Sequence, residues 1–344
     1  MRVAILGASG YAGLELVRIV LRHPELELAA VTSEQRAGSA VADVFPALRG
    51  LVDLRFEAAD PASLAQRADV AFTALPHATA APLVAALRKG GVIVVDISAD
   101  FRLRDRATYE RWYGPHGAPE LFGTAVYGLP ELHGDELPGA TLVAAPGCYP
   151  TGALLPLVPF LRAGLVETAP IFIDAKTGVS GAGRTLEDGF LFAELDGNAR
   201  AYKVASHRHG PEIEQEATLV AGEDVAVTFV PYLLPAVRGI ATTVFLRPRA
   251  ALDAARAQEI LESFYADAPF VRVVPQGETP SLQAVRGSNF CDVGAVVDER
   301  HGTLVALSAI DNLVKGAGGQ GVQCLNRVMG WEETLGLLEA PLLP

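Results

Sequence analysis

VAILGASGYAGLELVRIV, residues 3–20, decides the fold of the first half of this chain. Its first four residues are all apolar, as in a strand that is buried on both faces of a parallel sheet. Apolar residues then recur at helical spacing over residues 11–23. A glycine-rich turn joins the two parts, so the stretch predicts a strand, a tight turn and a helix.

The same alternation continues to about residue 147. Apolar strands separated by helices indicate a parallel sheet that is covered on both faces. After the first strand, we expect strands at residues 26–31, 70–75, 92–97 and 141–145, and a helix at 81–88. This part of the chain therefore predicts an α/β domain of the Rossmann type, which is a dinucleotide-binding fold.

The pattern changes after about residue 150 and predicts an α+β domain with an antiparallel or mixed sheet and helices on one face. Its strands are expected at residues 171–175, 225–230, 240–246, 290–297 and 303–310, and its helices near 154–162, 211–219 and 252–266. A last helix is expected at 313–329, followed by a proline-rich surface strap at 340–344. We expect residues 1–147 and 312–344 to form the first domain, and residues 148–311 the second.

Composition narrows the class of protein. The chain has 344 residues, of which 50% are hydrophobic and 20% charged, which is typical of a folded protein of two domains and excludes a disordered one. Its formal net charge of −12 argues against nucleic acid or an anionic membrane as a partner. No apolar run is long enough to span a bilayer, and the apolar stretch at the N-terminus is too short for a signal peptide. We expect a cytoplasmic protein.

The turn GASGYAG at residues 7–13 has the spacing GxxGxxG between a strand and a helix. Glycines allow a tight turn and bring backbone N–H groups at the helix N-terminus against a pyrophosphate. The alternative is an ordinary glycine-rich turn without a ligand. We expect a dinucleotide to contact Gly7, Ser9, Gly10, Tyr11, Ala12 and Gly13.

The end of the second predicted strand bears on the choice between NAD and NADP. An acidic residue there binds the ribose 2′-hydroxyl of NAD, whereas small polar residues with an arginine admit the 2′-phosphate of NADP. Here the strand ends near Ser33 and the chain reaches Arg36, whereas Glu34 lies past the strand end. We therefore expect NADP(H), bound in part by Ser33 and Arg36.

Cys148 follows a predicted strand and the dipeptide Pro146-Gly147. Pro150 suits the first turn of a helix, so we expect Cys148 at the N-cap, where the helix dipole and free N–H groups stabilise a thiolate. The alternative is a cysteine buried for packing, which we expect of Cys291 and Cys324. The three cysteines contain no CxxC pair, so neither a disulfide framework nor a metal site is expected.

Histidines mark two further places. His207, Arg208 and His209 stand together before a predicted helix; imidazole transfers protons near neutral pH, and arginine binds anions. A solvated cluster of charges is the alternative reading. Pro76 and His77 follow a parallel strand at the end where such folds bind ligands, and we count both among the residues expected to contact the dinucleotide.

Seven motifs lie in order along the chain: GASGYAG at 7–13, LPH at 75–77, DISADFRL at 96–103, PGCYPT at 146–151, KTGVSGAG at 176–183, HRHGPEI at 207–213 and AIDNLVKGAGGQ at 309–320. Together they resemble the N-acetyl-γ-glutamyl-phosphate reductases of arginine biosynthesis, which are related to the aspartate-semialdehyde dehydrogenases. The resemblance covers nearly the whole chain.

The resemblance implies the reduction of an acyl phosphate to an aldehyde by NADPH, with Cys148 as the nucleophile. It leaves open whether His207 or His209 is the acid–base residue. It implies that Arg102, Lys176 and Arg238 hold the anionic groups of the substrate, and that Asn312 and Gly316 lie beside the nicotinamide. It also implies that the second domain is the catalytic and dimerisation domain of a homodimer or homotetramer.

Three alternatives differ from this reading. A reductase of carrier-linked aminoadipyl phosphate in lysine biosynthesis would have residues resembling Asn-Ala after the cysteine, where this chain has Tyr149-Pro150. An aspartate-semialdehyde dehydrogenase is disfavoured by HRHGPEI. A dinucleotide-binding regulator without catalytic activity would need the glycines, but it would not need Cys148 and the paired histidines.

Overall fold

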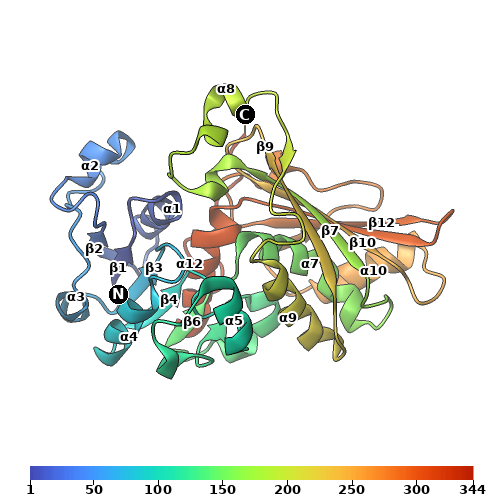
Figure 1. The fold of residues 1–344 in the computed structure, drawn as a ribbon, viewed down its shortest axis with the longest axis horizontal. Helices are drawn as coiled ribbons and strands as arrows, with labels where there is room; N and C mark the ends of the chain where they lie inside the picture. The colour runs from blue at the N-terminus through green and yellow to red at the C-terminus, as the bar shows by residue number, and fades with distance from the viewer. Residues whose placement is uncertain (344) are drawn as a thin grey trace. The chain divides into compact units, whose positions relative to one another are not determined.

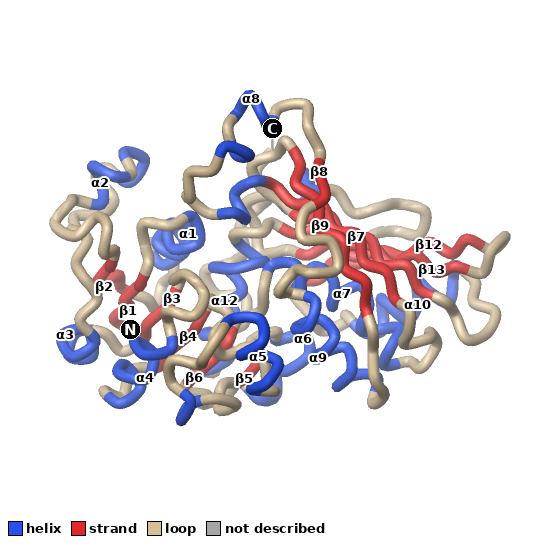
Figure 2. The backbone as a smooth tube through the Cα atoms, viewed as in Figure 1, coloured by secondary structure: helices blue, strands red, loops and turns tan. Residues whose placement is uncertain are grey.

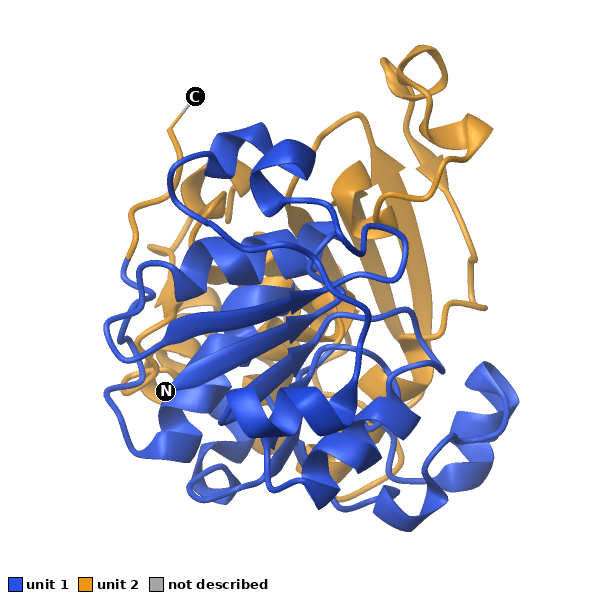
Figure 3. Ribbon diagram, turned by 90° about the vertical axis from the view of Figure 1, so that its left-hand side faces the viewer, with its two compact units in different colours: residues 1–146, 317–338 blue, residues 147–316, 339–344 orange. Residues whose placement is uncertain are grey.

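The computed structural model describes residues 1–343 and divides into two compact units (Figure 3). Unit 1 comprises residues 1–146 and 317–338, and unit 2 comprises residues 147–316 and 339–344. Residues 312–316 and the C-terminal strap therefore lie in unit 2, although the sequence places them in the first domain. No helix within residues 1–343 has the length and apolarity that crossing a membrane requires.

Unit 1 is built on a six-stranded sheet in the order β2-β1-β3-β4-β6-β5, in which every pair of neighbouring strands is parallel. The strands are β1 (Arg2–Leu6), β2 (Glu27–Thr32), β3 (Val70–Thr73), β4 (Ile93–Asp96), β5 (Val126–Tyr127) and β6 (Leu142–Ala144). Four of them are buried over nearly their whole length because both faces are covered. The predicted Rossmann-type sheet is confirmed, with β5 as an additional short strand.

The principal helices of unit 1 are α1 (Tyr11–Val20), α3 (Pro61–Arg67), α4 (Ala81–Lys89), α5 (Arg106–Tyr113) and α12 (Gly319–Met329). The shorter ones are α2 (Val41–Val44) and α6 (Pro130–His133). Helix α1 packs on α12, and α3 packs on α4, so that helices lie on both sides of the sheet (Figure 3). The start of α3 is fixed by Asp60, whose carboxylate accepts hydrogen bonds from the N–H groups of Ala62 and Ser63.

Unit 2 contains a seven-stranded sheet in the order β11-β12-β13-β10-β7-β9-β8. Figure 1 labels four of its strands, β7, β9, β10 and β12. The strands are β7 (Ile171–Gly178), β8 (Arg200–Ala201), β9 (Val227–Leu234), β10 (Ile240–Leu246), β11 (Val271–Val273), β12 (Cys291–Asp298) and β13 (Thr303–Ile310). The pairs β7–β9 and β11–β12 are parallel and the other pairs antiparallel, so the sheet is mixed, as expected.

Three helices of unit 2, α7 (Cys148–Arg162), α9 (Gly210–Ala221) and α10 (Ala254–Phe264), pack on one side of this sheet (Figure 2). Two shorter helices are α8 (Phe192–Leu195) and α11 (Leu282–Val285). Helix α7 is buried along almost its whole length, which fits a sequence that is apolar all round. Strand β7 alternates buried and exposed residues, so its second face points away from α7.

Candidate active site

The glycine-rich turn of unit 1 has the geometry that a pyrophosphate cradle requires. Gly7 has φ +81°, and a Cβ at Gly7 would overlap the carbonyl oxygen of Ala74. A Cβ at Gly13 would overlap the backbone of Gly7 and Ala8. Helix α1 starts at Tyr11 with Gly10 as its N-cap. The turn can therefore bring the first amides of α1 close to an anion, and it fits a dinucleotide.

The end of β2 suits NADP. The Ser33 hydroxyl lies 2.7 Å from the Ser9 hydroxyl, which ties the strand end to the glycine-rich turn. The carboxylate of Glu34 accepts a hydrogen bond of 2.9 Å from the N–H of Ala59, so it serves a neighbouring loop. Arg36 is exposed. Small hydroxyls and an exposed guanidinium at this place fit a 2′-phosphate.

The loop that carries His77 is held by Asp100, a residue that sequence reasoning missed. The fully buried Asp100 carboxylate accepts hydrogen bonds from the N–H groups of Ala78 (2.6 Å), Ala80 (3.0 Å) and Ala81 (3.0 Å), and so caps α4. His77 Nδ1 accepts a hydrogen bond of 3.2 Å from the N–H of Ala99. The segments after β3 and β4 are thereby fixed to each other. The sequence signal that could have pointed to Asp100 is its place in the motif DISADFRL.

Arg102 lies inside unit 1, with 4% of its surface exposed. Its Nε donates to the carbonyl oxygen of Ala145 (2.8 Å), and its Nη2 donates to that of Ile97 (2.6 Å). These contacts join the segments that follow β4 and β6. These contacts fit a structural role for Arg102, and its predicted contact with an anionic group of the substrate stays a prediction.

Cys148 is the first residue of α7, and the N-cap is Gly147, one position earlier than the sequence predicted, since Cys148 itself was expected there. It is partly exposed, whereas Cys291 and Cys324 are fully buried, as expected for packing residues. At this position the N–H groups of the first turn and the helix dipole stabilise a thiolate. The buried Glu212 fixes the turn, because its Oε1 accepts a hydrogen bond of 2.8 Å from the N–H of Gly147.

His209 lies against the backbone that immediately precedes the cysteine. A Cβ at Gly147 would lie 2.6 Å from His209 Nε2, so only glycine leaves room for the ring. The His209 ring also packs edge-on against Tyr149, at 5.8 Å between ring centroids. His209 is therefore the histidine whose ring lies against the backbone immediately before Cys148.

His207 has a different environment. Its Nδ1 accepts a hydrogen bond of 3.1 Å from the N–H of His209, and its ring packs against Tyr149 and Phe229. Burial, together with the nearby charges of Lys203 and Arg208, lowers the pKa of His207 to about 4. His207 is thus neutral near pH 7 and holds the backbone of its neighbour in place.

Lys176 does not lie beside Cys148. On β7 it forms an ion pair of 2.8 Å with Asp174, and it shares the face of the sheet that points away from α7. Its sheet neighbours confirm this orientation. A Cβ on Gly152 of α7 would touch Thr242 of β10, and Thr242 pairs with Ala175, the residue before Lys176.

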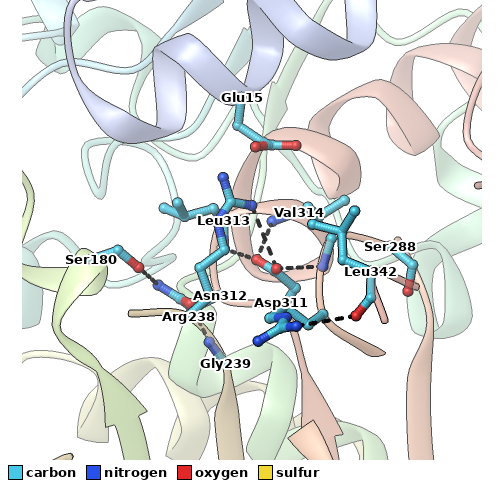
Figure 4. A network of polar contacts seen from close by, with 12 residues as sticks. Glu15, Ser180, Arg238, Gly239, Ser288, Asp311, Asn312, Leu313, Val314 and Leu342 are labelled. Carbon is cyan, nitrogen blue, oxygen red and sulfur yellow. Dashed lines mark hydrogen bonds and ion pairs between the residues drawn. The ribbon is translucent and has the colours of Figure 1, made fainter. Parts of the chain in front are cut away.

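Arg238 belongs to a polar network at the starts and ends of the strands of unit 2 (Figure 4). Its Nη1 lies 3.5 Å from Oδ2 of the buried Asp311. Asn312 accepts a hydrogen bond of 2.7 Å from the N–H of Gly239 and donates one of 3.0 Å to the Ser180 hydroxyl. Gly316 packs on Cys148, since a Cβ there would lie 2.8 Å from the Cβ of Cys148.

Unit 2 therefore gathers Cys148, His209, Glu212 and Gly316 around the first turn of α7, and Arg238 lies in the network of Asp311. A thiol at a helix N-terminus with an imidazole beside its turn can act as a nucleophile with an acid–base partner. Within residues 1–343, no cluster of three or more His, Cys, Asp or Glu side chains could hold a metal ion.

Comparison with known proteins supports the same chemistry. The family model "Semialdehyde dehydrogenase, NAD binding domain" matches residues 2–140, and "Semialdehyde dehydrogenase, dimerisation domain" matches residues 148–312. N-acetyl-gamma-glutamyl-phosphate reductases from Citrifermentans bemidjiense and Geobacter sulfurreducens are each 49% identical to this chain, over 100% of both sequences.

Solved structures with the same fold include two aspartate semialdehyde dehydrogenases. The enzyme from Vibrio cholerae matches with a TM-score of 0.72 and 18% identity, over 95% of this chain and 97% of that one. The enzyme from Candida albicans, whose structure contains NADP, matches with a TM-score of 0.72 and 16% identity, over 94% and 97%. The chain belongs to the semialdehyde dehydrogenase family and, within it, to the N-acetyl-gamma-glutamyl-phosphate reductases.

Proposed function

We propose that this protein reduces N-acetyl-glutamyl 5-phosphate to N-acetylglutamate 5-semialdehyde and phosphate with NADPH, in arginine biosynthesis. The observation that carries the proposal is the position of Cys148 at the start of a buried helix, with the His209 ring against the preceding glycine. Relatives that share 49% of their residues over the full length have the name of this activity.

The arrangement of Cys148 accounts for the first step. The thiolate forms a bond to the acyl carbon, the bond between that carbon and the phosphate oxygen breaks, and inorganic phosphate leaves a thioester on the enzyme. The N–H groups at the start of α7 and the helix dipole favour the thiolate form of the sulfur. Glu212 holds the turn in place through the N–H of Gly147.

Reduction completes the reaction. When bound, NADPH would supply the hydride that reduces the thioester carbon. His209 then donates a proton to the oxygen of the resulting thiohemiacetal and takes it back as the carbon–sulfur bond breaks, which releases the aldehyde and regenerates the thiolate. His207 holds the backbone N–H of His209 and takes no part in the proton transfer.

The coenzyme is NADP(H). We propose that the turn of residues 7–13 holds its pyrophosphate, that Ser33 and Arg36 contact the 2′-phosphate, and that Pro76 and His77 lie along it. Asn312 and Gly316 are proposed to lie near the nicotinamide. For the anionic groups of the substrate we propose Arg238, a quarter of whose side chain is exposed.

We further propose that the free face of the unit 2 sheet pairs with a second copy of the chain, in a homodimer or in a homotetramer built from it. One cross-strand row on this face consists of Phe172, Phe245, Val305 and Val296. Phe172 is 50% exposed, and Phe245 and Val296 are each 40% exposed. A contiguous apolar row of this kind is typical of an interface between subunits.

The assay that tests the activity runs the reaction backwards with N-acetylglutamate semialdehyde, inorganic phosphate and NADP, following the absorbance of the reduced coenzyme. We expect turnover with NADP and much less with NAD. The aminoadipate homologue has one more methylene, which is worth about 1–3 kcal/mol of discrimination. Faster turnover of that homologue would assign the chain to the lysine pathway, and no turnover of either would favour a regulator.

We propose a cytoplasmic location, where the reducing environment protects an exposed thiol such as Cys148 from oxidation. The net charge of −12 favours a small-molecule substrate held by a few placed cations, with neither nucleic acid nor a membrane surface as a partner.

A further inference from the structure

Asp311 is the first residue after β13, and its side chain is fully buried. Its Oδ1 accepts hydrogen bonds from the N–H groups of Leu313 (2.8 Å) and Val314 (3.2 Å). Its Oδ2 accepts one from the N–H of Gly287 (2.7 Å) and lies 3.5 Å from Nη1 of Arg238 (Figure 4). One carboxylate thus joins three segments that are far apart in the sequence.

The backbone of Asp311 contacts the part of this network that lies against Cys148. Its carbonyl oxygen accepts a hydrogen bond of 2.9 Å from the N–H of Gly316. Gly316 lies in the π-helical turn Val314–Gly318 and packs against Cys148. Through Oδ1 and this carbonyl oxygen, Asp311 fixes the turn that forms one wall beside the cysteine.

Oδ2 of Asp311 contacts the residues near which the anionic groups of the substrate are proposed to bind. Arg238 and Arg286 both line an open cavity of about 520 Å³, together with Ala236, Val237, Leu282 and Gln283. Gly287, which Oδ2 holds, is the residue after Arg286. A single oxygen atom therefore sets the place of one arginine directly, and that of the other through the adjoining turn.

The C-terminal strap supports the same turn. The N–H of Leu342 donates to the carbonyl oxygen of Arg286 (2.7 Å), and Arg286 Nη2 donates to that of Leu342 (3.3 Å). The side chain of Leu342 covers Gly287 so closely that a Cβ there would lie 2.6 Å from it.

We propose that Asp311 is a positioning residue for the reaction: it sets Arg238, and with it the anionic end of the substrate, in register with the turn that packs on Cys148. The proposal rests on the proposed function. The buried carboxylate gives the guanidinium a charged partner, which restricts it to one orientation at the cavity. The C-terminal strap contributes to the same positioning, because Leu342 contacts Arg286 and Gly287.

The variant Asp311→Asn tests the two sides separately. Asparagine keeps Oδ1 for Leu313 and Val314, but puts an NH₂ group where Oδ2 met Gly287 and Arg238. In the reverse assay we expect KM for the semialdehyde to rise at least tenfold, with a smaller change in kcat and an unchanged KM for NADP. The matched control is Asp292→Asn, which loses another buried carboxylate of unit 2 whose partner is Arg272 at 2.7 Å.

A double-mutant cycle shows whether Asp311 acts through Arg238. In an Arg238→Gln background, Asp311→Asn should raise KM by less than twofold further. A full additional increase, or a KM no different from that of the Asp292→Asn control, would overturn the proposal. A wild-type chain that turns over no substrate would instead overturn the proposed function.

Deleting residues 339–344 tests the same positioning of the substrate in a second way. This variant provides the test if Asp311→Asn does not fold. Without Leu342 the turn at Gly287 loses its cover, so we expect KM for the semialdehyde to rise about threefold or more, with the KM for NADP unchanged. An unaltered semialdehyde KM in the folded truncated chain would contradict the proposal.

Discussion

Cys148 and the two other cysteines differ in the features that govern thiol reactivity. Cys148 is partly exposed at a helix N-terminus, whereas Cys291 and Cys324 are fully buried within β12 and α12. We expect one equivalent of iodoacetamide at neutral pH to modify Cys148 first and to abolish reduction. Peptide mass spectrometry locates the label. Modification of Cys291 or Cys324 with activity retained would refute the assignment of the nucleophile.

The two histidines should respond differently to substitution. His209→Asn removes the proposed acid–base group and should lower kcat by about 10²–10⁴-fold. His207→Gln keeps an acceptor for the N–H of His209 and should lower kcat far less. The comparison needs steady-state rates for both variants at equal NADP saturation. An equal loss in the two would mean that the imidazoles act as one unit.

Burial of His207 also predicts a pH dependence of stability. Its pKa is about 4 in the folded state, against an ordinary value of 6.5, so the unfolded chain binds its proton more tightly. Stability from this group is therefore present above pH 6.5 and is lost as the pH falls towards 4. Between pH 7 and 5 the loss is about 2 kcal/mol.

Urea unfolding at the two pH values measures this loss, and His207→Gln is the comparison that isolates it. Burial raises the pKa of Asp96 to about 6, which contributes the opposite sign over the same range, so the wild type alone reports only the sum. On going from pH 7 to pH 5, the variant should lose less free energy of unfolding than the wild type. The same pH slope in both proteins would show that His207 does not titrate as described.

The position of Cys148 at the start of a helix was predictable because it depends on local sequence alone, whereas its role as the nucleophile stays a prediction. Cys148 needs only a strand, a turn and a helix around it, and these were readable from Pro146 to Pro150. Glu212 and Asp311 act through contacts between distant segments, and no local pattern shows them. Lys176 lies on the far face of its strand, a consequence of alternation that its motif alone did not show.

Elements were predictable where they are long and periodic. Strands β10 and β13 have the expected bounds, and α7 starts at the cysteine, earlier than its apolar run suggested. The strands β5 and β8 have two residues each, which is too few to produce a period. Helix α5 is mainly polar, and its clearest sign was the capping residue Asp105.

The junction of β1 and α1 allows a test at one glycine. Gly13→Ala would place a methyl group against the backbone of Gly7 and Ala8 and push α1 away from the turn. We expect the Kd for NADPH, measured by fluorescence titration, to rise at least tenfold. The control is Gly210→Ala at the start of α9, where a Cβ would meet no atom within 4 Å. Equal NADPH affinity in both variants would contradict the proposal that the turn of residues 7–13 binds the pyrophosphate.

The division of the chain into two units allows coenzyme binding and assembly to be tested separately. The glycine-rich turn lies wholly in unit 1, whereas the free face of the seven-stranded sheet lies wholly in unit 2. A substitution on that face should change the oligomeric state and leave the Kd for NADPH as it is. The exposed Phe245 at the centre of the apolar row is the position at which a charge is most disruptive.

Phe245→Glu would place a carboxylate between Phe172 and Val305, and burying it against a second copy would cost several kcal/mol. We expect light scattering coupled to gel filtration to find the wild type as a dimer or tetramer and the variant as a monomer. Leu51→Glu is the matched control, because Leu51 is 65% exposed in unit 1, outside both sheets. If the Phe245→Glu variant forms an oligomer of the same mass as the wild type, the subunits associate through another surface.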